Sequence, residues 1–306
     1  MDKLDKKVLL TGSSGFLGLN LTKELIRKRY KVYCVYNTKL KKKYNNVKYI
    51  KCNLENYNEI KKKLKNIKFK YVINLAGYGI HDDFTKGGSK IIFNHFLIAM
   101  NLANYFLNKK ISKFINIGSA DEYGKNKHPQ KENMKEDPLS SYSFVKISNT
   151  YLFQMLHKKY NFPSVTLRPF LVYGPYQETN RLIPYVIKSC IKNKSFNITE
   201  GGQFRDFCYV DDFSNAVIKC LNTKKVNGEV INIASGKKIQ IKSVVKIINS
   251  KIKLGKPLFG KKQMRKEENY SLYANIEKAK KLIKWRPKID INNGLDFTIK
   301  HYLKNE

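Results

Sequence analysis

Cysteine and acidic residues are both scarce in this sequence of 306 residues. The five cysteines are far apart and form no Cys-x-x-Cys motif, which excludes a disulfide framework and is typical of free thiols. The five histidines are equally scattered, so we expect no metal site. No apolar run approaches the roughly 20 residues of a membrane helix, and the N-terminus shows no signal-peptide pattern. We therefore expect a cytoplasmic protein without membrane association.

The shortage of acidic residues leaves a large excess of positive charge. The 60 Lys and Arg residues outnumber the 24 Asp and Glu residues, for a net charge of +36. A hydrophobic content of 42% is enough for a core and excludes a disordered chain. The excess is nearly all lysine spread along the chain, which is typical of a solvated surface. We therefore do not favour a nucleic-acid partner, although the charge would attract a small polyanionic substrate.

The first half of the chain alternates short apolar strands with helices. Strands are expected over 8–10, 31–36, 71–75, 114–117 and 165–167, and helices over 15–29, 56–65, 91–107 and 143–160. This alternation is typical of an α/β fold in which helices cover both faces of a parallel sheet. It predicts a Rossmann-type doubly wound sheet.

Three glycines follow the first expected strand and open the first helix. Gly12 allows a tight turn, Gly15 lets the backbone approach a pyrophosphate, and Gly18 permits close packing of helix on strand. The amides and dipole of the helix N-terminus face the same phosphate position. In this strand–turn–helix context the motif indicates a dinucleotide site.

The regularity of the pattern drops after Pro169. We expect residues 1–168 to form the dinucleotide-binding domain, to which 206–235 returns with the apolar segment Val230–Ile233 at the sheet edge. Residues 169–306 would otherwise form a smaller substrate-binding cap. Such a cap would lie over the carboxyl ends of the strands, where sheets of this kind bind their ligands.

The end of the second expected strand bears on the choice of dinucleotide. NAD sites place a carboxylate there for the adenosine ribose, but this chain has Asn37, followed by Lys39. No carboxylate would repel a 2′-phosphate, and Lys39 could attract one. These residues favour NADP(H). NAD(H) stays open, because Asn37 could instead hydrogen-bond the ribose of NAD.

Tyr142 and Lys146 lie four residues apart at the start of an expected helix. Residues at this spacing share a helix face, and an ammonium lowers the pKa of a nearby phenol, which can then act as acid or base. Chance could produce this pair in a lysine-rich chain. Ser119, however, follows the strand over 114–117, at a carboxyl end where a hydroxyl can meet a ligand oxygen. These three residues beside a dinucleotide would suit proton and hydride transfer.

With these residues in place, the sequence resembles the extended short-chain dehydrogenases/reductases of the nucleotide-sugar epimerase/dehydratase family. Motifs of the family run in order along nearly the whole chain. They occupy 11–18, 74–77, 118–124, 142–146, 167–169, 172–175, 205–212 and 285–287. Together they are specific for the family and much less so for the reaction.

The resemblance implies a role for each candidate residue. Tyr142 exchanges the proton of a sugar hydroxyl or ketone, Lys146 holds the nicotinamide ribose, and Ser119 hydrogen-bonds the reacting oxygen. Asn53 stands where the family usually has Asp beside the adenine, which weakens one hydrogen-bond prediction. The other implied cofactor contacts are Phe16, Leu17, Leu54, Leu75, Ala76 and Gly77.

The resemblance also implies a nucleotide-diphosphate sugar as substrate. Guanidinium groups suit a diphosphate, so Arg205 and Arg265 are the expected anchors, with Arg181 as a third candidate. Asp121 is expected on the substrate side of the site. Family members commonly pair apolar helices like 91–107 and the one after Tyr142, which implies a homodimer.

Three reactions share this scaffold: 4-epimerisation, 4,6-dehydration and reduction of a 4-keto sugar. Family dehydratases carry Asp-Glu directly after the Ser or Thr, where this chain, aligned on 123–124, has Ala120 and Asp121. Because Ala120 stands in the place of the dehydratase acid, the sequence argues against dehydration. The alternative is that Asp121 and Glu122 act as the pair, displaced by one residue. The pattern over 118–124 is similar to that of family reductases, and NADPH would suit a reductase.

We therefore expect reduction at C4 of a nucleotide-diphospho-4-keto-6-deoxyhexose. A nucleotide-sugar 4-epimerase or 4,6-dehydratase is the alternative. A non-catalytic dinucleotide-sensing or nucleic-acid-binding protein is a remote alternative, because such a protein would not need the set of Ser119, Tyr142 and Lys146.

Overall fold

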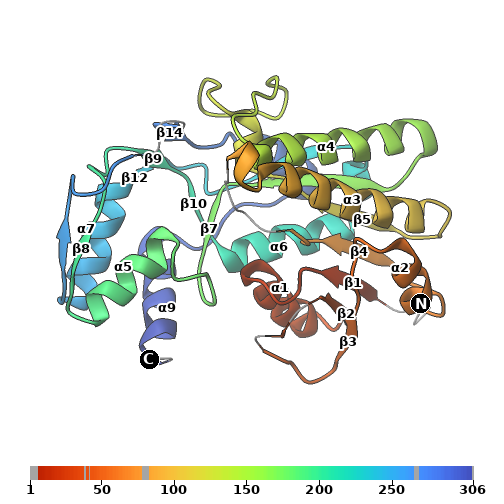
Figure 1. The fold of residues 1–306 in the computed structure, drawn as a ribbon, viewed down its shortest axis with the longest axis horizontal. Coiled ribbons are helices and arrows are strands. Elements are labelled where there is room, and N and C mark those ends of the chain that lie inside the picture. Colours follow the sequence, from red (N-terminus) through yellow and green to blue (C-terminus); the bar gives the residue numbers. More distant parts are fainter. Residues whose placement is uncertain (1–5, 38, 41, 78–82, 265–268, 305–306) are drawn as a thin grey trace.

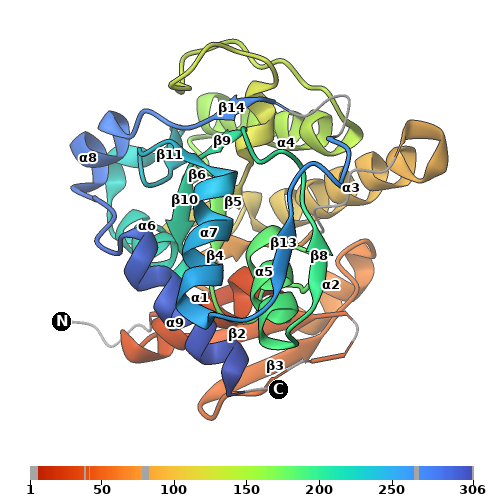
Figure 2. The ribbon, with the colours of Figure 1, turned by 90° about the vertical axis from the view of Figure 1, so that its left-hand side faces the viewer.

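The computed structural model describes residues 6–37, 39–40, 42–77, 83–264 and 269–304. Seven parallel strands form one sheet in the order β3-β2-β1-β4-β5-β6-β11. Its part from β3 to β5 is labelled in Figure 1, and β6 and β11 are labelled in Figure 2. The bounds of the strands are Lys7–Thr11 (β1), Lys31–Tyr36 (β2), Val47–Lys51 (β3), Tyr71–Asn74 (β4), Lys113–Ile117 (β5), Ser164–Pro169 (β6) and Val230–Ile233 (β11). The strand order reverses beside β1, as in a doubly wound Rossmann sheet, so the predicted fold class is confirmed.

Helices cover both faces of the sheet (Figure 1). One face carries α1 and α6, and the other carries α2, α3 and α4. Their bounds are Phe16–Arg27 (α1), Tyr57–Leu64 (α2), Gly88–Leu107 (α3), Ser141–Tyr160 (α4) and Val210–Leu221 (α6). Val8 and Leu10 pack into the first layer and Leu9 into the second. Burial on both faces explains why these strands are continuously apolar. Within the described ranges, no helix has the length and apolar character to cross a membrane.

A smaller unit adjoins the sheet domain (Figures 1 and 2). It consists mainly of three helices and of small sheets in the orders β10-β7, β12-β9-β14 and β13-β8. The helices are Leu182–Ile191 (α5), Ile241–Ile252 (α7) and Ile291–Leu303 (α9). The strands are Leu171–Tyr173 (β7), Ser195–Asn197 (β8), Phe204–Arg205 (β9), Phe207–Tyr209 (β10), Ile239–Gln240 (β12), Lys256–Leu258 (β13) and Ser271–Leu272 (β14). The short helix α8 (Glu277–Ile283) packs near β11.

Two of the differences from the sequence expectation have a clear local cause. β3 is not predicted, because it is an edge strand whose Lys48 and Lys51 are exposed, which hides the apolar pattern of a strand. α4 begins at Ser141 instead of 143, because the hydroxyl oxygen of Ser140 accepts a hydrogen bond from the Ser143 N–H at 3.1 Å and caps the helix. The earlier start places Tyr142 inside the first turn of α4.

Candidate active site

The turn after β1 leaves the N-terminus of α1 open to an anion. Gly12 adopts a φ of +63°, and its carbonyl oxygen accepts a hydrogen bond from the Gly15 N–H at 3.2 Å. Gly15 is the N-cap of α1, yet its cap carries no side-chain hydrogen bond and no acidic residue lies in the first turn. Phe16 and Leu17 form that turn, so its amides and dipole are suited to a phosphate.

The three glycines are needed for two different reasons. A Cβ at Gly12 would lie 2.4 Å from the Leu75 carbonyl oxygen, and one at Gly18 would lie 2.3 Å from the Gly12 carbonyl oxygen. Packing alone therefore excludes side chains at both positions. A Cβ at Gly15 would meet only the Gly12 oxygen at 3.5 Å, an ordinary contact. Packing does not require Gly15, whereas the close approach of a pyrophosphate does, so these residues fit a dinucleotide.

The segment after β4 lies against the same turn. The Ala76 N–H donates a hydrogen bond to Thr11 Oγ1 at 3.1 Å, which joins the ends of β4 and β1. Gly77 is exposed with a φ of +130°, and a Cβ there would lie 2.9 Å from the His95 ring. The expected pyrophosphate residues 75–77 therefore adjoin the glycine turn.

The expected adenosine contacts follow β2 and β3. Asn37 comes directly after β2 and is exposed. The Asn53 side-chain oxygen accepts a hydrogen bond from the Glu55 N–H at 3.0 Å, so the amide that replaces the family's Asp supports a local turn. Leu54 is buried, and its carbonyl oxygen accepts a hydrogen bond from Asn101 Nδ2 of α3 at 3.0 Å.

Ser119, Tyr142 and Lys146 converge at the carboxyl end of β5. Ser119 is the N-cap of the short 3₁₀ turn η2 (Ala120–Tyr123). The side chains of Ser119 and Tyr142 share a hydrogen bond. Lys146 Nζ lies 5.5 Å from the centre of the Tyr142 ring. Because β5 neighbours β4, and β4 neighbours β1, the three residues and the glycine turn share one edge of the sheet.

Burial controls the ionisation of both catalytic candidates on α4. It raises the pKa of Tyr142, despite the opposing hydrogen bond with Ser119. It lowers the pKa of Lys146 to about 8, against the charge of Glu122. The expected lowering of the phenol pKa is therefore outweighed in this structure. Lys146 Nζ instead donates a hydrogen bond to the Ile117 carbonyl oxygen at 2.8 Å, and burial of the phenol dominates.

Two of the expected substrate residues act on Tyr142 electrostatically. Asp121 lies half-buried in η2, and its charge raises the pKa of the phenol. Arg181 is the exposed N-cap residue of α5, and its charge lowers that pKa. The structure therefore brings Arg181, from the smaller unit, within electrostatic range of the catalytic candidates on the sheet domain.

Arg205 of β9 is the buried member of the expected diphosphate anchors. Its Nη1 donates hydrogen bonds to the carbonyl oxygens of Phe204 at 2.8 Å and Tyr270 at 3.4 Å. The backbone of β9 and of the residue before β14 thus fixes the orientation of this guanidinium group. Arg265, the other expected anchor, lies outside the described residues.

The sequence suggests for Glu122 only a role in a displaced dehydratase pair with Asp121, whereas the structure places it directly behind Ser119. It is fully buried and forms an ion pair with Arg168 at 2.7 Å. One signal could have revealed the pair: both residues are charged within segments that are otherwise buried, and a buried charge requires a partner.

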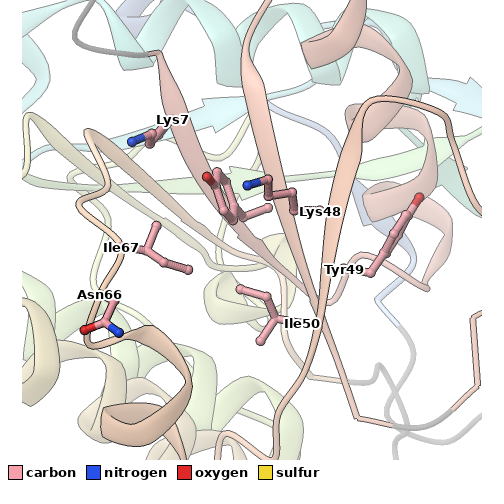
Figure 3. A pocket seen from close by; sticks show the side chains of 7 residues that line it. Lys7, Lys48, Tyr49, Ile50, Asn66 and Ile67 are labelled. Carbon is pink, nitrogen blue, oxygen red and sulfur yellow. The ribbon is translucent and has the colours of Figure 1, made fainter.

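A hollow elsewhere on the sheet does not belong to this site (Figure 3). It has a volume of about 530 Å³ and is lined by Lys7, Tyr33, Lys48, Tyr49, Ile50, Asn66 and Ile67. Lys7 is the first residue of β1, whereas the glycine turn follows the last residue of that strand. The hollow therefore lies away from the carboxyl edge that carries the candidate site.

Comparison with known proteins identifies the family. A model of the NAD dependent epimerase/dehydratase family matches residues 8–234. The chain belongs to this family. A UDP-glucuronate 4-epimerase from Thermodesulfobacterium geofontis is 28% identical, with 95% of this chain and 94% of the relative covered. A dTDP-glucose 4,6-dehydratase from Haemophilus influenzae is 26% identical, with 97% and 98% covered.

A solved family structure agrees with the fold over nearly the whole chain. The UDP-glucuronic acid 4-epimerase from Bacillus cereus, in complex with UDP-glucuronic acid and NAD, has a TM-score of 0.88 at 26% identity. The match covers 98% of this chain and all of that chain. The predicted resemblance is confirmed at the level of the family. Since these relatives are named for different reactions, family membership does not select one.

Proposed function

We propose that this protein reduces the C4 carbonyl of a nucleotide-diphospho-4-keto-6-deoxyhexose. The arrangement of the fully described turn 120–122 carries the proposal. Ala120 is buried in an apolar cluster, and the carboxylate of Glu122 is buried against Arg168. Of the two acids of this turn, Asp121 acts more strongly on the phenol of Tyr142, while Glu122 is engaged by Arg168. Elimination of water from C5 and C6 needs both an acid and a base, whereas reduction at C4 needs a single proton donor.

In the proposed reaction each of the three residues acts on one atom or group. NADPH, when bound, would supply the hydride for the C4 carbon. Tyr142 delivers its proton to the carbonyl oxygen, and Ser119 donates a hydrogen bond to the same oxygen, so that the product is an alcohol. The ammonium of Lys146 holds the nicotinamide ribose. The raised pKa of Tyr142 supports this direction, because it keeps the phenol protonated as a reduction requires.

We place the nucleotide sugar between the sheet domain and the smaller unit. In this proposal residues 169–306, apart from 206–235, form the cap that binds the substrate. Arg205 and Arg181 bind the diphosphate from the cap side, together with Arg265. Bidentate guanidinium contacts and the net charge of +36 both favour such an anion.

We propose NADP(H) as the preferred dinucleotide. Asn37 and the exposed Lys39 follow β2, and no carboxylate stands there to repel a 2′-phosphate. Lys39 is a better candidate for that phosphate than Lys42, whose Nζ already donates a hydrogen bond to the Tyr176 hydroxyl at 2.9 Å. The solved relative that contains NAD keeps NAD(H) as the alternative.

A direct assay tests the reductase. The purified protein is incubated with nucleotide-linked 4-keto-6-deoxyhexoses and NADPH, while the absorbance of NADPH is followed and the products are identified by mass spectrometry. We expect equal amounts of NADPH consumed and alcohol formed. Tyr142→Phe should abolish turnover, whereas Tyr160→Phe, at the exposed end of the same helix, should not. Full turnover by Tyr142→Phe would show that the mechanism is wrong.

A nucleotide-sugar 4-epimerase is the second candidate. The full-length likeness to a UDP-glucuronate 4-epimerase favours it, and the same three residues could serve transient oxidation at C4. An epimerase would retain its dinucleotide and need none added. Release of bound NAD(H) on denaturation, with interconversion of UDP-sugars without added cofactor, would therefore favour the epimerase over the reductase.

We further propose that the protein is a homodimer joined through α3 and α4. Phe93 and Met100 on α3, and Phe144 and Met155 on α4, are each between 44% and 65% exposed. The two helices pack against each other, and the residues of each pair recur at helical spacing. Exposed apolar side chains of this size, on two helices that pack against each other, suit a second copy of the chain.

A further inference from the structure

Glu122 holds the backbone of the catalytic serine. Its Oε1 accepts a hydrogen bond from the Ser119 N–H at 2.8 Å, while Ser119 Oγ accepts one from the Asp121 N–H at 3.1 Å. These two bonds form a capping box at the start of η2. A Cβ at Gly118 would lie 2.3 Å from Glu122 Oε1. The residue before Ser119 must therefore be glycine for the carboxylate to reach this position.

The second oxygen of the same carboxylate joins two further elements. Glu122 Oε2 accepts a hydrogen bond from Thr150 Oγ1 at 2.9 Å, and Thr150 lies on α4 one turn after Lys146. It also accepts one from Arg168 Nε at 2.8 Å, on β6. One buried carboxylate thus ties the serine turn, the helix of Tyr142 and Lys146, and the neighbouring strand together.

The guanidinium of Arg168 is shared with a second acid. Its Nη2 lies 2.5 Å from Glu136 Oε1, and Glu136 Oε2 accepts a hydrogen bond from the exposed Tyr151. The Arg168 guanidinium also stacks 4.7 Å from the centre of the Tyr123 ring. Two carboxylates surround one buried cation. Burial raises the pKa of Glu122, whereas the Arg168 charge and the hydrogen bonds from Ser119, Arg168 and Thr150 oppose this effect and favour its charged form near the lysine.

We infer that Glu122 is a positioning residue of the proposed reductase: it fixes Ser119 against Tyr142 and keeps a negative charge beside Lys146. The inference rests on the proposed function only where turnover is measured. The charge of Glu122 acts on the side chains of both Tyr142 and Lys146.

The charged and titratable groups around Lys146 determine how its pKa would respond to loss of the Glu122 charge. Asp121 and Glu122 face it from η2, His95 from α3 and Tyr142 from its own helix. Burial disfavours the protonated form of Lys146, and the negative charge of Glu122 stabilises it. Without that charge, Lys146 would lose its proton at a lower pH. A variant without this charge should therefore lose lysine-dependent binding at a lower pH than the native protein.

Glu122→Gln tests the inference against the matched variant Glu136→Gln, which removes the other acidic partner of Arg168. We expect Glu122→Gln to lower kcat about tenfold with little change in the KM for the sugar. Its dinucleotide affinity should decline at a pH about one unit lower than in the native protein. Glu136→Gln should keep kcat within about twofold and leave the pH profile unchanged.

The pH profile of dinucleotide affinity, followed by quenching of protein fluorescence, requires no sugar. It therefore tests Glu122 even if the protein is not a reductase. Equal effects of the two variants on kcat and pH profile would mean that Glu122 is merely structural and would overturn the inference. If Glu122→Gln does not fold, Glu122→Asp decides, because it keeps the charge but withdraws it from Ser119. A lower kcat of Glu122→Asp, with the pH profile of dinucleotide affinity unchanged, would support the positioning role of Glu122. An unchanged kcat would refute that role.

Discussion

The Nζ of Lys146 donates a hydrogen bond of 2.8 Å to the carbonyl oxygen of Ile117, the last residue of β5. This bond connects helix α4, which carries Tyr142, to the strand that ends two residues before Ser119. It also holds the ammonium in a buried place, where desolvation lowers the pKa of Lys146 to about 8. Lys146 therefore connects α4 to β5 and also titrates at about pH 8.

The first prediction concerns this titration. The lowered pKa means that Lys146 is charged below pH 8 and neutral above it, so dinucleotide affinity should fall as the pH rises through about 8. Lys146→Arg keeps its charge at every accessible pH and should remove this decline, even if its overall affinity is lower. Titration of the dinucleotide on both sides of pH 8 measures the effect. A native affinity that is constant through this range would contradict the assignment.

The second prediction separates the roles of Gly12 and Gly15 in the glycine turn. Gly12→Ala forces a Cβ to within 2.4 Å of the Leu75 carbonyl oxygen at a positive φ, and should destabilise the fold by about 3 kcal/mol. Gly15→Ala meets no such contact and should cost less than about 1 kcal/mol. It should nevertheless weaken dinucleotide binding at least about tenfold, because its methyl group occupies the approach of the pyrophosphate. Urea denaturation and dinucleotide titration distinguish the two losses. Unimpaired binding by Gly15→Ala would refute the role given to that glycine.

The sheet could be predicted because its central strands are buried on both faces. Such strands are apolar throughout, so β2 appears in the sequence with the bounds that it has in the structure. The edge strand β3 could not be found, since solvent takes the place of one neighbour and lysines interrupt its pattern. The sequence could also predict that Ser119, Tyr142 and Lys146 lie together. They follow strands of a parallel sheet, and the carboxyl ends of such strands meet at one edge.

The partner of Glu122 could not be predicted from chain order, although a charge in an otherwise buried segment requires some partner. Glu122 and Arg168 are 46 positions apart, and only the packing of β6 beside β5 brings them together. The motif around Arg205 shows the same limit. It suggested substrate contact, yet the carboxylate of its second residue, Asp206, holds the backbone of two loops through the N–H groups of Ser235, Gly236 and Ala274.

The third prediction follows from this role of Asp206. It accepts hydrogen bonds at 2.6 Å from the Ser235 N–H and at 2.9 Å from the Gly236 N–H while buried. Asp206→Asn replaces an acceptor by a donor in front of these amides and should destabilise the protein by about 2–3 kcal/mol. Ser235→Ala removes the hydroxyl, which donates to Asp206 Oδ1 at 2.6 Å and accepts from the Lys237 N–H at 3.2 Å, and should cost about 1 kcal/mol. Chemical denaturation of both variants measures the difference, and equal losses would mean that the backbone bonds contribute little.

The fourth prediction tests Arg205 as an anchor of the diphosphate. Its guanidinium is oriented by the Phe204 and Tyr270 carbonyl oxygens, an arrangement that lysine cannot reproduce with its single ammonium. Arg205→Lys should therefore raise the KM for the nucleotide sugar about tenfold or more while changing kcat little. Arg286→Lys, at an exposed position, serves as the control. An unchanged KM for Arg205→Lys would exclude the side chain from substrate binding.

The fifth prediction concerns the apolar face of α3 and α4. Phe144 is 50% exposed on α4, so an aspartate there is solvated in the monomer but buried and unpaired in a dimer formed through this face. Phe144→Asp should therefore weaken self-association at least about tenfold while leaving the monomer folded. Phe297→Asp on α9, where the side chain is 51% exposed, changes a different surface and should leave the dimer intact. Sedimentation of the native protein and both variants over a range of concentrations measures this. A native monomer, or a dimer that survives Phe144→Asp, would exclude this face as the interface.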